Sequence, residues 1–190
     1  MGEIRPFSSS KSRIWLVIVI VLGDVIIDQV IKLYVATHYG LGESHEVFSW
    51  FWLCYVENNG MAFGIEWFSK LALTLFRLLA VGLLGWYAHM LINKPDTKTG
   101  YLATIAFIIA GALGNIIDCV FYGKLFGYAD WFYGKVVDMF YFPLIHNQAG
   151  EVLFFRPVFN FADSCITCSI FVIAIFYLKE LNQDEKKSEK

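Results

Sequence analysis

Charged residues are scarce in this sequence, and neither sign predominates. Asp, Glu, Lys and Arg make up 17% of the 190 residues, and the formal net charge at pH 7 is −2. A protein that binds nucleic acid needs a basic face, so this balance argues against a nucleic-acid partner. A disordered chain has many charges and few aromatic residues, whereas 18% of this chain is aromatic, which argues against disorder.

The motifs of zinc and serine peptidases are also missing. No second histidine follows His45 and Glu46 at the spacing of H-E-x-x-H, and no G-x-S-x-G occurs. Cys165 and Cys168 have C-x-x-C spacing, but they lie in an apolar run with no nearby histidine or second cysteine pair. The favoured interpretation of this pair is apolar packing, so we expect neither a metal nor a cofactor.

Apolar residues, in contrast, are abundant, at 57% of the chain with a mean hydropathy of +0.55. A helix that crosses a bilayer needs about 20 mostly apolar residues, and four stretches are long enough: 14–35, 71–92, 102–122 and about 159–178. The first lacks the small-residue cleavage site of a signal peptide and carries charges in its second half. The predicted fold class is an all-α polytopic membrane protein with four transmembrane helices, in a single domain over 1–190.

Lysine and arginine in the short flanks of these stretches predict the orientation in the membrane. One side would carry Arg5, Lys11, Arg13, Lys94, Lys98, Lys179, Lys186, Lys187 and Lys190, and the other Lys70, Lys124, Lys135 and Arg156 in longer connections. Both termini are therefore expected in the cytoplasm. The outer segments, 36–70 and 123–158, would face away from it.

The outer segments contain two aromatic-rich stretches, 48–68 and 127–144. Such stretches favour the membrane surface, as strands or as an interfacial helix, and periodicity does not decide between these. We therefore predict a small β-rich or irregular outer segment and an interfacial helix. We also expect the two stretches to clamp a bound peptide, with Asn58 and Gly60 in contact with its backbone; the alternative for Asn58 and Gly60 is a plain turn.

Ionisable groups at membrane depth cost about 2.5–3.5 kcal/mol each on insertion scales, so each one needs an explanation. Asp24, Asp28 and Lys32 are spaced four and four in the first stretch, which places them on one helical stripe. Asp28 and Lys32 either pair to hold the helices together or border a site, and the two interpretations are compatible.

Polar residues in the third and fourth stretches raise the same question. In the third, Gly111 and Gly114 allow close helix packing, while Asn115 and Asp118 share a face and either join helices or border a site. The fourth stretch begins with Asn160 and Asp163, which fit a helix cap. Asp138, in the outer segment, is either a solvated carboxylate or, given its apolar flanks, one drawn into an apolar surface.

Taken in order, these motifs resemble lipoprotein signal peptidase, also called signal peptidase of type II. The matching blocks are Asp28-Gln29-Val30-Ile31-Lys32, Asn58-x-Gly60-x-Ala62-Phe63, Gly111-x-x-Gly114-Asn115-x-x-Asp118, Val136-Val137-Asp138 and Phe159-Asn160-x-Ala162-Asp163. The resemblance implies Asp138 and Asp163 as a catalytic pair. It implies supporting or substrate-binding roles for Asp28, Lys32, Asn58, Gly60, Gly111, Asn115, Asp118 and Asn160.

The resemblance also implies a substrate and a place in the cell. The substrate would be a bacterial prolipoprotein, cut before a cysteine that carries a diacylglyceryl group, and the site would lie at the outer face of the inner membrane. Membrane lipid would be a partner, and we expect a monomer. One departure stands out, because the family usually has arginine after the aspartate of the third block, where this chain has Cys119. The hydrogen-bond donor of that arginine is therefore either missing here or replaced, with Lys124 or Lys135 as the candidates.

The chemistry of paired carboxylates supports this interpretation independently. Two close carboxylates share one proton, so that one activates water as a base and the other serves the leaving amine as an acid. Two other functions stay open: a small transporter or channel that uses Asp24, Asp28, Lys32 and Asp118 as an ion path, and a structural membrane subunit. The absence of an inverted repeat makes a transporter less favoured.

Overall fold

The computed structural model describes residues 9–59, 69–146, 152–154 and 157–181, and its helices are α1 (Ser10–His38), α2 (Lys70–Asn93), α3 (Thr99–Ile117) and α5 (Phe161–Val172). Helix α3 continues through a π-helical turn (Asp118–Tyr122) into the short α4 (Gly123–Leu125), and α5 continues through a second π-helical turn (Ile173–Tyr177). Within the described residues, four helical segments are long and apolar enough to cross a membrane, which confirms the predicted fold class.

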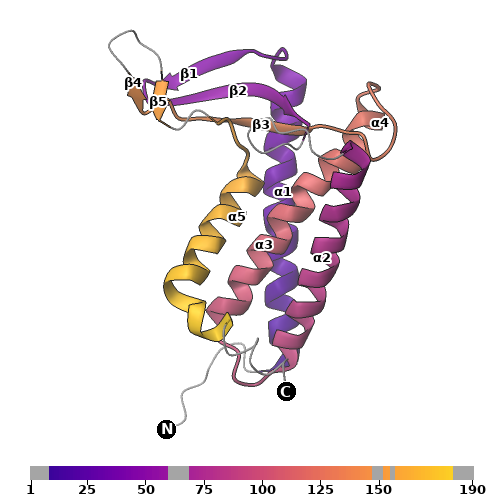
Figure 1. The fold of residues 1–190 in the computed structure, drawn as a ribbon, viewed down its shortest axis with the longest axis vertical. Coiled ribbons are helices and arrows are strands. Elements are labelled where there is room, and N and C mark those ends of the chain that lie inside the picture. The colour runs from indigo at the N-terminus through magenta and orange to yellow at the C-terminus, as the bar shows by residue number, and fades with distance from the viewer. Residues whose placement is uncertain (1–8, 60–68, 147–151, 155–156, 182–190) are drawn as a thin grey trace.

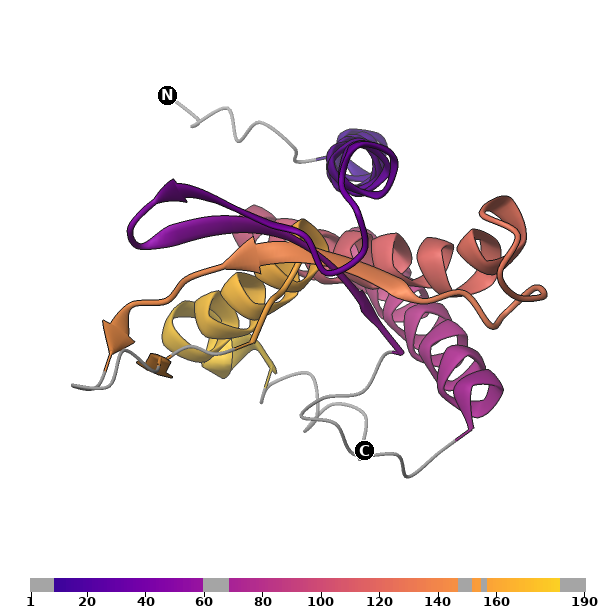
Figure 2. The ribbon, with the colours of Figure 1, turned by 90° about the horizontal axis from the view of Figure 1, so that it is seen from above.

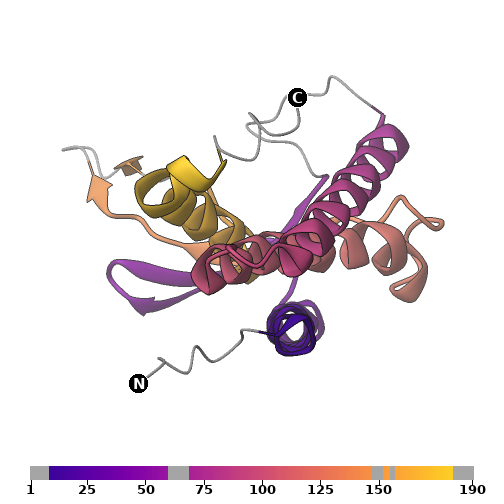
Figure 3. The same ribbon diagram turned by 90° about the horizontal axis from the view of Figure 1, so that it is seen from below.

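Helix α3 lies at the centre of the bundle. Of its most apolar stretch, 67% is buried, against 11% in each of the other three spans. Helices α2, α3 and α5 lie side by side in a row, and α1 lies on one face of that row (Figures 2 and 3). Because α3 contacts all three neighbours, its polar residues can meet side chains from each of them.

The outer surfaces of the bundle are apolar. Large side chains such as Val19 on α1, Trp86 on α2 and Phe171 on α5 are more than half exposed. A helix that is apolar on all faces suits the hydrocarbon of a bilayer, where exposed apolar surface carries no penalty. Serine begins two of these helices, since the hydroxyls of Ser9 and Ser69 accept hydrogen bonds from backbone N–H groups of the first turns of α1 and α2.

A small sheet lies across one end of the bundle (Figure 1). Its strands are β1 (Ser44–Phe48), β2 (Phe51–Asn58) and β3 (Val136–Tyr141), antiparallel and in the order β1-β2-β3, with Val56 opposite Asp138. Strands β4 (Ile145–His146) and β5 (Val152–Phe154) form a second pair. Both aromatic stretches thus supply strands, and their described residues contain no helix; residues 60–68 lie outside the described part.

An apolar cluster attaches this sheet to the helices. It joins Val35 of α1, Tyr55 of β2, Tyr122 of the first π-helical turn, and Val137 and Met139 of β3. All five side chains are less than a tenth exposed. The cluster holds β3, and with it Asp138, directly above the ends of α1 and α3.

Candidate active site

A helix cap positions Asp163 at the start of α5. Asn160 is the N-cap residue, and its Oδ1 accepts a hydrogen bond of 2.9 Å from the Asp163 N–H. The Asp163 carboxylate accepts the Asn160 N–H in return, at 3.5 Å. The capping arrangement considered from the sequence is therefore present, and it places a carboxylate where the helix dipole favours negative charge.

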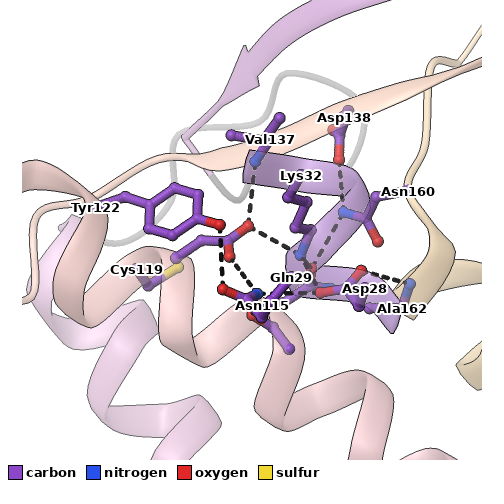
Figure 4. A network of polar contacts seen from close by, with 12 residues as sticks. Asp28, Gln29, Lys32, Asn115, Cys119, Tyr122, Val137, Asp138, Asn160 and Ala162 are labelled. Carbon is purple, nitrogen blue, oxygen red and sulfur yellow. Dashed lines mark hydrogen bonds and ion pairs between the residues drawn. The ribbon is translucent and has the colours of Figure 1, made fainter. Parts of the chain in front are cut away.

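The amide of Asn160 also links Asp163 to Asp138. Its Nδ2 donates to Asp138 Oδ1 at 2.7 Å and to Asn115 Oδ1 at 3.1 Å, while Asn115 Nδ2 donates to Asp163 Oδ1 at 2.8 Å. Two aspartates and two asparagines thus form one hydrogen-bonded group at the sheet end of the bundle, and Figure 4 shows three of them, Asp138, Asn115 and Asn160. Asn160 and Asp138 are almost fully buried, whereas Asp163 is partly exposed.

Burial changes the acidity of Asp138. The loss of hydration and, next, the negative charge of Asp163 raise the pKa of Asp138 from 3.8 to about 7. Hydrogen bonds to its carboxylate oppose this rise, one from Asn160 and one from Asn58 Nδ2 at 3.0 Å, as does the charge of Lys32. Asp138 can therefore hold a proton near neutral pH.

Lys32 lies below this group, and buried side chains pair with its ammonium. Its Nζ is 2.8 Å from Asp28 Oδ2, 2.8 Å from Asp118 Oδ2 and 2.9 Å from Asn115 Oδ1. The side chains of Lys32, Asp28 and Asp118 are at most 1% exposed. The pairing of Asp28 with Lys32 considered from the sequence is present, and it extends to α3 through Asp118.

The two carboxylates that flank Lys32 each hold the backbone next to one member of the aspartate pair. Asp28 Oδ1 accepts the N–H of Ala162, which precedes Asp163, at 3.0 Å. Asp118 Oδ2 accepts the N–H of Val137, the residue before Asp138, at 3.2 Å. The lysine and its two carboxylates thus connect both segments that carry the pair.

Close packing of α3 against α1 and α5 depends on two glycines. A Cβ atom at Gly111 would lie 2.5 Å from the Ala162 carbonyl oxygen, and one at Gly114 would lie 2.5 Å from Asp28 Oδ2. Any larger residue would therefore displace the start of α5 or the Asp28 carboxylate. Gly60, the remaining candidate, lies outside the described residues.

An apolar groove reaches Asp163 from one side of the bundle. Its volume is about 650 Å³. Aromatic rings and small α5 side chains line it together with Asp163: Phe51, Phe140, Phe142, Pro157, Phe159, Phe161, Ser164, Thr167 and Cys168. An apolar chain in this groove would lie against the Asp163 carboxylate.

The prediction that Lys124 or Lys135 replaces the family arginine was wrong. Lys124 pairs with Asp130, and Lys135 with Glu57. Instead, Arg77 of α2 donates from Nη1 to Cys119 Sγ at 3.0 Å. An arginine within an apolar stretch is itself a signal of function or of interhelical contact, and the sequence interpretation did not use it.

Two further residues of the network were not among the predicted site residues. Gln29 donates to Asp118 Oδ1 at 2.9 Å, and Tyr122 donates to Gln29 Oε1 at 3.0 Å. Gln29 could have been found from its place in the first block, beside Asp28. Tyr122 could have been found from its position four residues after Asp118, on a related face of the helix.

The protein has four spanning helices and a buried group of carboxylates and amides beside an apolar groove. These features are those of a multi-pass membrane enzyme. Solved structures of the same fold agree. One, titled "Bacterial membrane enzyme structure by the in meso method at 2.3 A resolution", is 30% identical, with a TM-score of 0.67 over 88% of this chain and 90% of that one. A second, at 1.9 Å, is also 30% identical, with a TM-score of 0.63 over 86% and 92%.

The chain belongs to the signal peptidase II family. The family described as "Signal peptidase (SPase) II" matches residues 17–179. The lipoprotein signal peptidase of Porphyromonas gingivalis is 44% identical over 177 residues, 80% of this chain and 78% of that protein. That of Amoebophilus asiaticus is 32% identical over 197 residues, 93% and 84% of the two chains. The family resemblance is thereby confirmed, and the protein is a bacterial multi-pass membrane protease.

Proposed function

We propose that this protein removes signal peptides from diacylglyceryl-modified prolipoproteins, with Asp138 and Asp163 as the catalytic pair. The observation that carries the proposal is the amide of Asn160, which donates to Asp138 and accepts the N–H of Asp163. A single side chain thereby contacts the Asp138 carboxylate and the backbone of Asp163. The names of the relatives support the proposed substrate class, and the arrangement of the two carboxylates supports the proposed chemistry.

The proposed reaction is hydrolysis by water held between the two carboxylates. Asp163 takes a proton from the water as its oxygen attacks the carbonyl carbon before the lipidated cysteine. Asp138 gives its proton to the cysteine nitrogen as the peptide bond breaks. The signal peptide leaves with a new carboxyl group and the lipoprotein with a free α-amine, and the proton returns from Asp163 to Asp138.

The surroundings of the two aspartates support these separate roles. Asp138, whose pKa is raised to about 7, is suited to hold the shared proton and act as the acid. Asp163 lies in the first turn of α5 and accepts a hydrogen bond from Asn115, which holds its carboxylate in position to act as the base. Such pairs titrate together, so the proton belongs to the pair rather than to one residue.

The apolar groove beside Asp163 supports a substrate that arrives from the membrane. It lies between the underside of the sheet and the first turns of α5, a spanning helix. An apolar segment of the lipidated substrate can therefore reach Asp163 without leaving an apolar environment. In the orientation predicted from lysine and arginine, the sheet and the site face the periplasm and both termini face the cytoplasm.

The distribution of polar groups disfavours an ion path. Asp28, Asp118, Asp138 and Asp163 gather at the sheet end, joined by the contacts described above. The opposite half of the bundle is filled by an apolar cluster that includes Leu91, Leu102 and Ile105 among its members. A channel would need polar groups along its whole length.

The decisive experiment compares Asp138→Asn and Asp163→Asn with the wild-type protein, each purified in detergent or lipid. The substrates are a prolipoprotein with its diacylglyceryl group and the same prolipoprotein without it. We expect the wild type to release the signal peptide from the lipidated form only, and both variants to be inactive while unfolding at temperatures no lower than that of the wild type. Mass spectrometry of the products would locate the cut before the modified cysteine.

Asp130→Asn is the matched control. Asp130 belongs to the same outer connection as Asp138, but its side chain is 84% exposed and forms an ion pair with Lys124. This variant should keep full activity. Near-normal cleavage by Asp138→Asn or Asp163→Asn would remove that aspartate from the mechanism.

A further inference from the structure

The side chain of Gln29 ties together the two ends of the π-helical turn at the end of α3. That turn begins at Asp118 and ends at Tyr122. Gln29 Nε2 donates to Asp118 Oδ1 at 2.9 Å, and Gln29 Oε1 accepts the Tyr122 hydroxyl proton at 3.0 Å. Turns of this type are rare and frequently occur at functional sites. One amide from α1 thus stabilises an uncommon backbone geometry.

The charges around Gln29 permit one orientation of its amide. Besides Asp118, its Nε2 lies 3.1 Å from the Gly114 carbonyl oxygen and 3.2 Å from Asp28 Oδ2. An amide turned by 180° would place Oε1 against two carboxylates and a carbonyl, all of which are acceptors. The Tyr122 hydroxyl reinforces the observed orientation, because it presents a donor to the acceptor end of the amide.

The orientation of Gln29 determines how Asp118 is held. With Oδ1 fixed by Gln29, Asp118 presents Oδ2 to Lys32 Nζ and to the N–H of Val137. Val137 is the residue before Asp138 on β3, and it lies in the same apolar cluster as Tyr122. A chain of hydrogen bonds therefore runs from Tyr122 through Gln29 and Asp118 to the strand that carries Asp138.

We propose that Tyr122 and Gln29 are positioning residues for Asp138, acting through Asp118 and the Val137 N–H. The proposal rests on the proposed function, in which Asp138 must stay in register with Asp163. Tyr122 is 2% exposed; its ring packs in the apolar cluster that holds β3, and its hydroxyl donates to Gln29. Removal of that one oxygen loosens the Gln29 amide, and through it the carboxylate that β3 depends on.

Tyr122→Phe tests this chain by the loss of one oxygen atom. A misplacement of about 1 Å at a reacting group can cost roughly a hundredfold in rate, and we expect kcat to fall about tenfold with KM within about twofold of wild type. Gln29→Met, which removes both ends of the amide, should lower kcat further. The double variant should be no slower than Gln29→Met, since both substitutions break the same chain.

Tyr101→Phe is the matched control. The Tyr101 hydroxyl is also buried and hydrogen-bonded, to the hydroxyl of Tyr87 at 2.8 Å, but it lies in the apolar cluster of the opposite half of the bundle. This variant should lose thermal stability to a similar extent and keep wild-type kcat. A kcat for Tyr122→Phe equal to that of Tyr101→Phe, at equal thermal stability, would overturn the proposal.

Hydrogen–deuterium exchange gives a measurement that does not depend on activity. The Val137 amide should exchange faster in Tyr122→Phe than in wild type, and its exchange rate in Tyr101→Phe should equal that of wild type. Equal protection in all three proteins would overturn the proposal that Tyr122 positions Asp138. An inactive wild type, or an active Asp138→Asn variant, would instead count against the proposed function. The two failures are therefore distinguishable.

Discussion

The carboxylate of Asp118 accepts a hydrogen bond from the backbone N–H of Val137, the residue immediately before Asp138. Asp28 makes the equivalent contact with Ala162, the residue immediately before Asp163. Lys32 lies between these two carboxylates at 2.8 Å from each. One buried ammonium thus connects the backbone supports of both members of the proposed pair.

Replacement of Lys32 should therefore destabilise the whole sheet end. Lys32→Met leaves Asp28 and Asp118 buried without their cation, and the loss of one partner from a buried ion pair costs about 3–5 kcal/mol. We expect a large drop in thermal unfolding temperature and low yield. Lys11→Met, at an exposed position on the same helix, is the control. Equal unfolding temperatures for the two variants would show that Lys32 does not stabilise the sheet end.

Asn160→Ala should reduce activity far more than stability. The variant loses a helix cap, worth about 1 kcal/mol, together with the contact to Asp138. Misplaced reacting groups can cost roughly a hundredfold, so we expect kcat to fall by about that factor. Ser69→Ala removes the equivalent cap from α2, which carries neither Asp138 nor Asp163. This variant should lose as much stability as Asn160→Ala and keep the wild-type kcat. Equal rates in the two variants would contradict the bridging role.

Asp138→Asn should be more stable than the wild type at neutral and alkaline pH. Because the pKa of Asp138 is raised to about 7 in the folded protein, folding favours its protonated form. Its contribution to stability is present below about pH 4 and is lost as the pH rises through 7, whereas asparagine does not titrate. One pKa unit corresponds to about 1.4 kcal/mol, so the gain at pH 8 is on the order of 2–4 kcal/mol.

Thermal unfolding between pH 5 and pH 8 measures this effect. The advantage of Asp138→Asn over the wild type should grow across that interval, while Asp130→Asn should differ little from wild type at every pH. An advantage that stayed constant with pH would show that Asp138 does not titrate in this range.

Loss of Asn58 should move the pH profile as well as weaken binding. The sequence alone predicts contact with substrate, so Asn58→Ala should raise KM more than it lowers kcat. The hydrogen bond from Asn58 to Asp138 lowers the pKa of that carboxyl, and its removal should shift the fall in activity at alkaline pH to higher pH. Asn59→Ala, at the exposed neighbouring position, should leave both quantities unchanged. An unshifted profile in Asn58→Ala would contradict the contact with Asp138.

Several features of the site followed from spacing within one helix. The interval of four between Asp28 and Lys32 places them on one stripe, and the structure pairs them at 2.8 Å. The interval of three between Asn160 and Asp163 predicted a cap, which is present. The four spans were predicted from apolar length alone, because a bilayer leaves a chain few ways to satisfy its backbone.

Contacts between distant segments required the tertiary structure. Alternation of residue types did not decide between strand and helix for the aromatic stretches. In their described parts, β2 pairs with β3, which shows that these residues form strands. Likewise, the sequence pointed to Lys124 or Lys135 near Cys119, whereas packing of α2 against α3 brings Arg77 there. A long side chain on a neighbouring helix can supply a hydrogen-bond donor that the local sequence lacks.

The sequence by itself determined the membrane class, the family and many of the residues that form the buried polar network. Only the tertiary structure decided which of these residues hold one another: Asp28 meets the N–H of Ala162 across 134 positions, and Asn160 meets Asp138 across 22. The physical reason is that helix periodicity relates residues one turn apart, whereas a buried polar group must find its partners wherever the packed helices and sheet bring them.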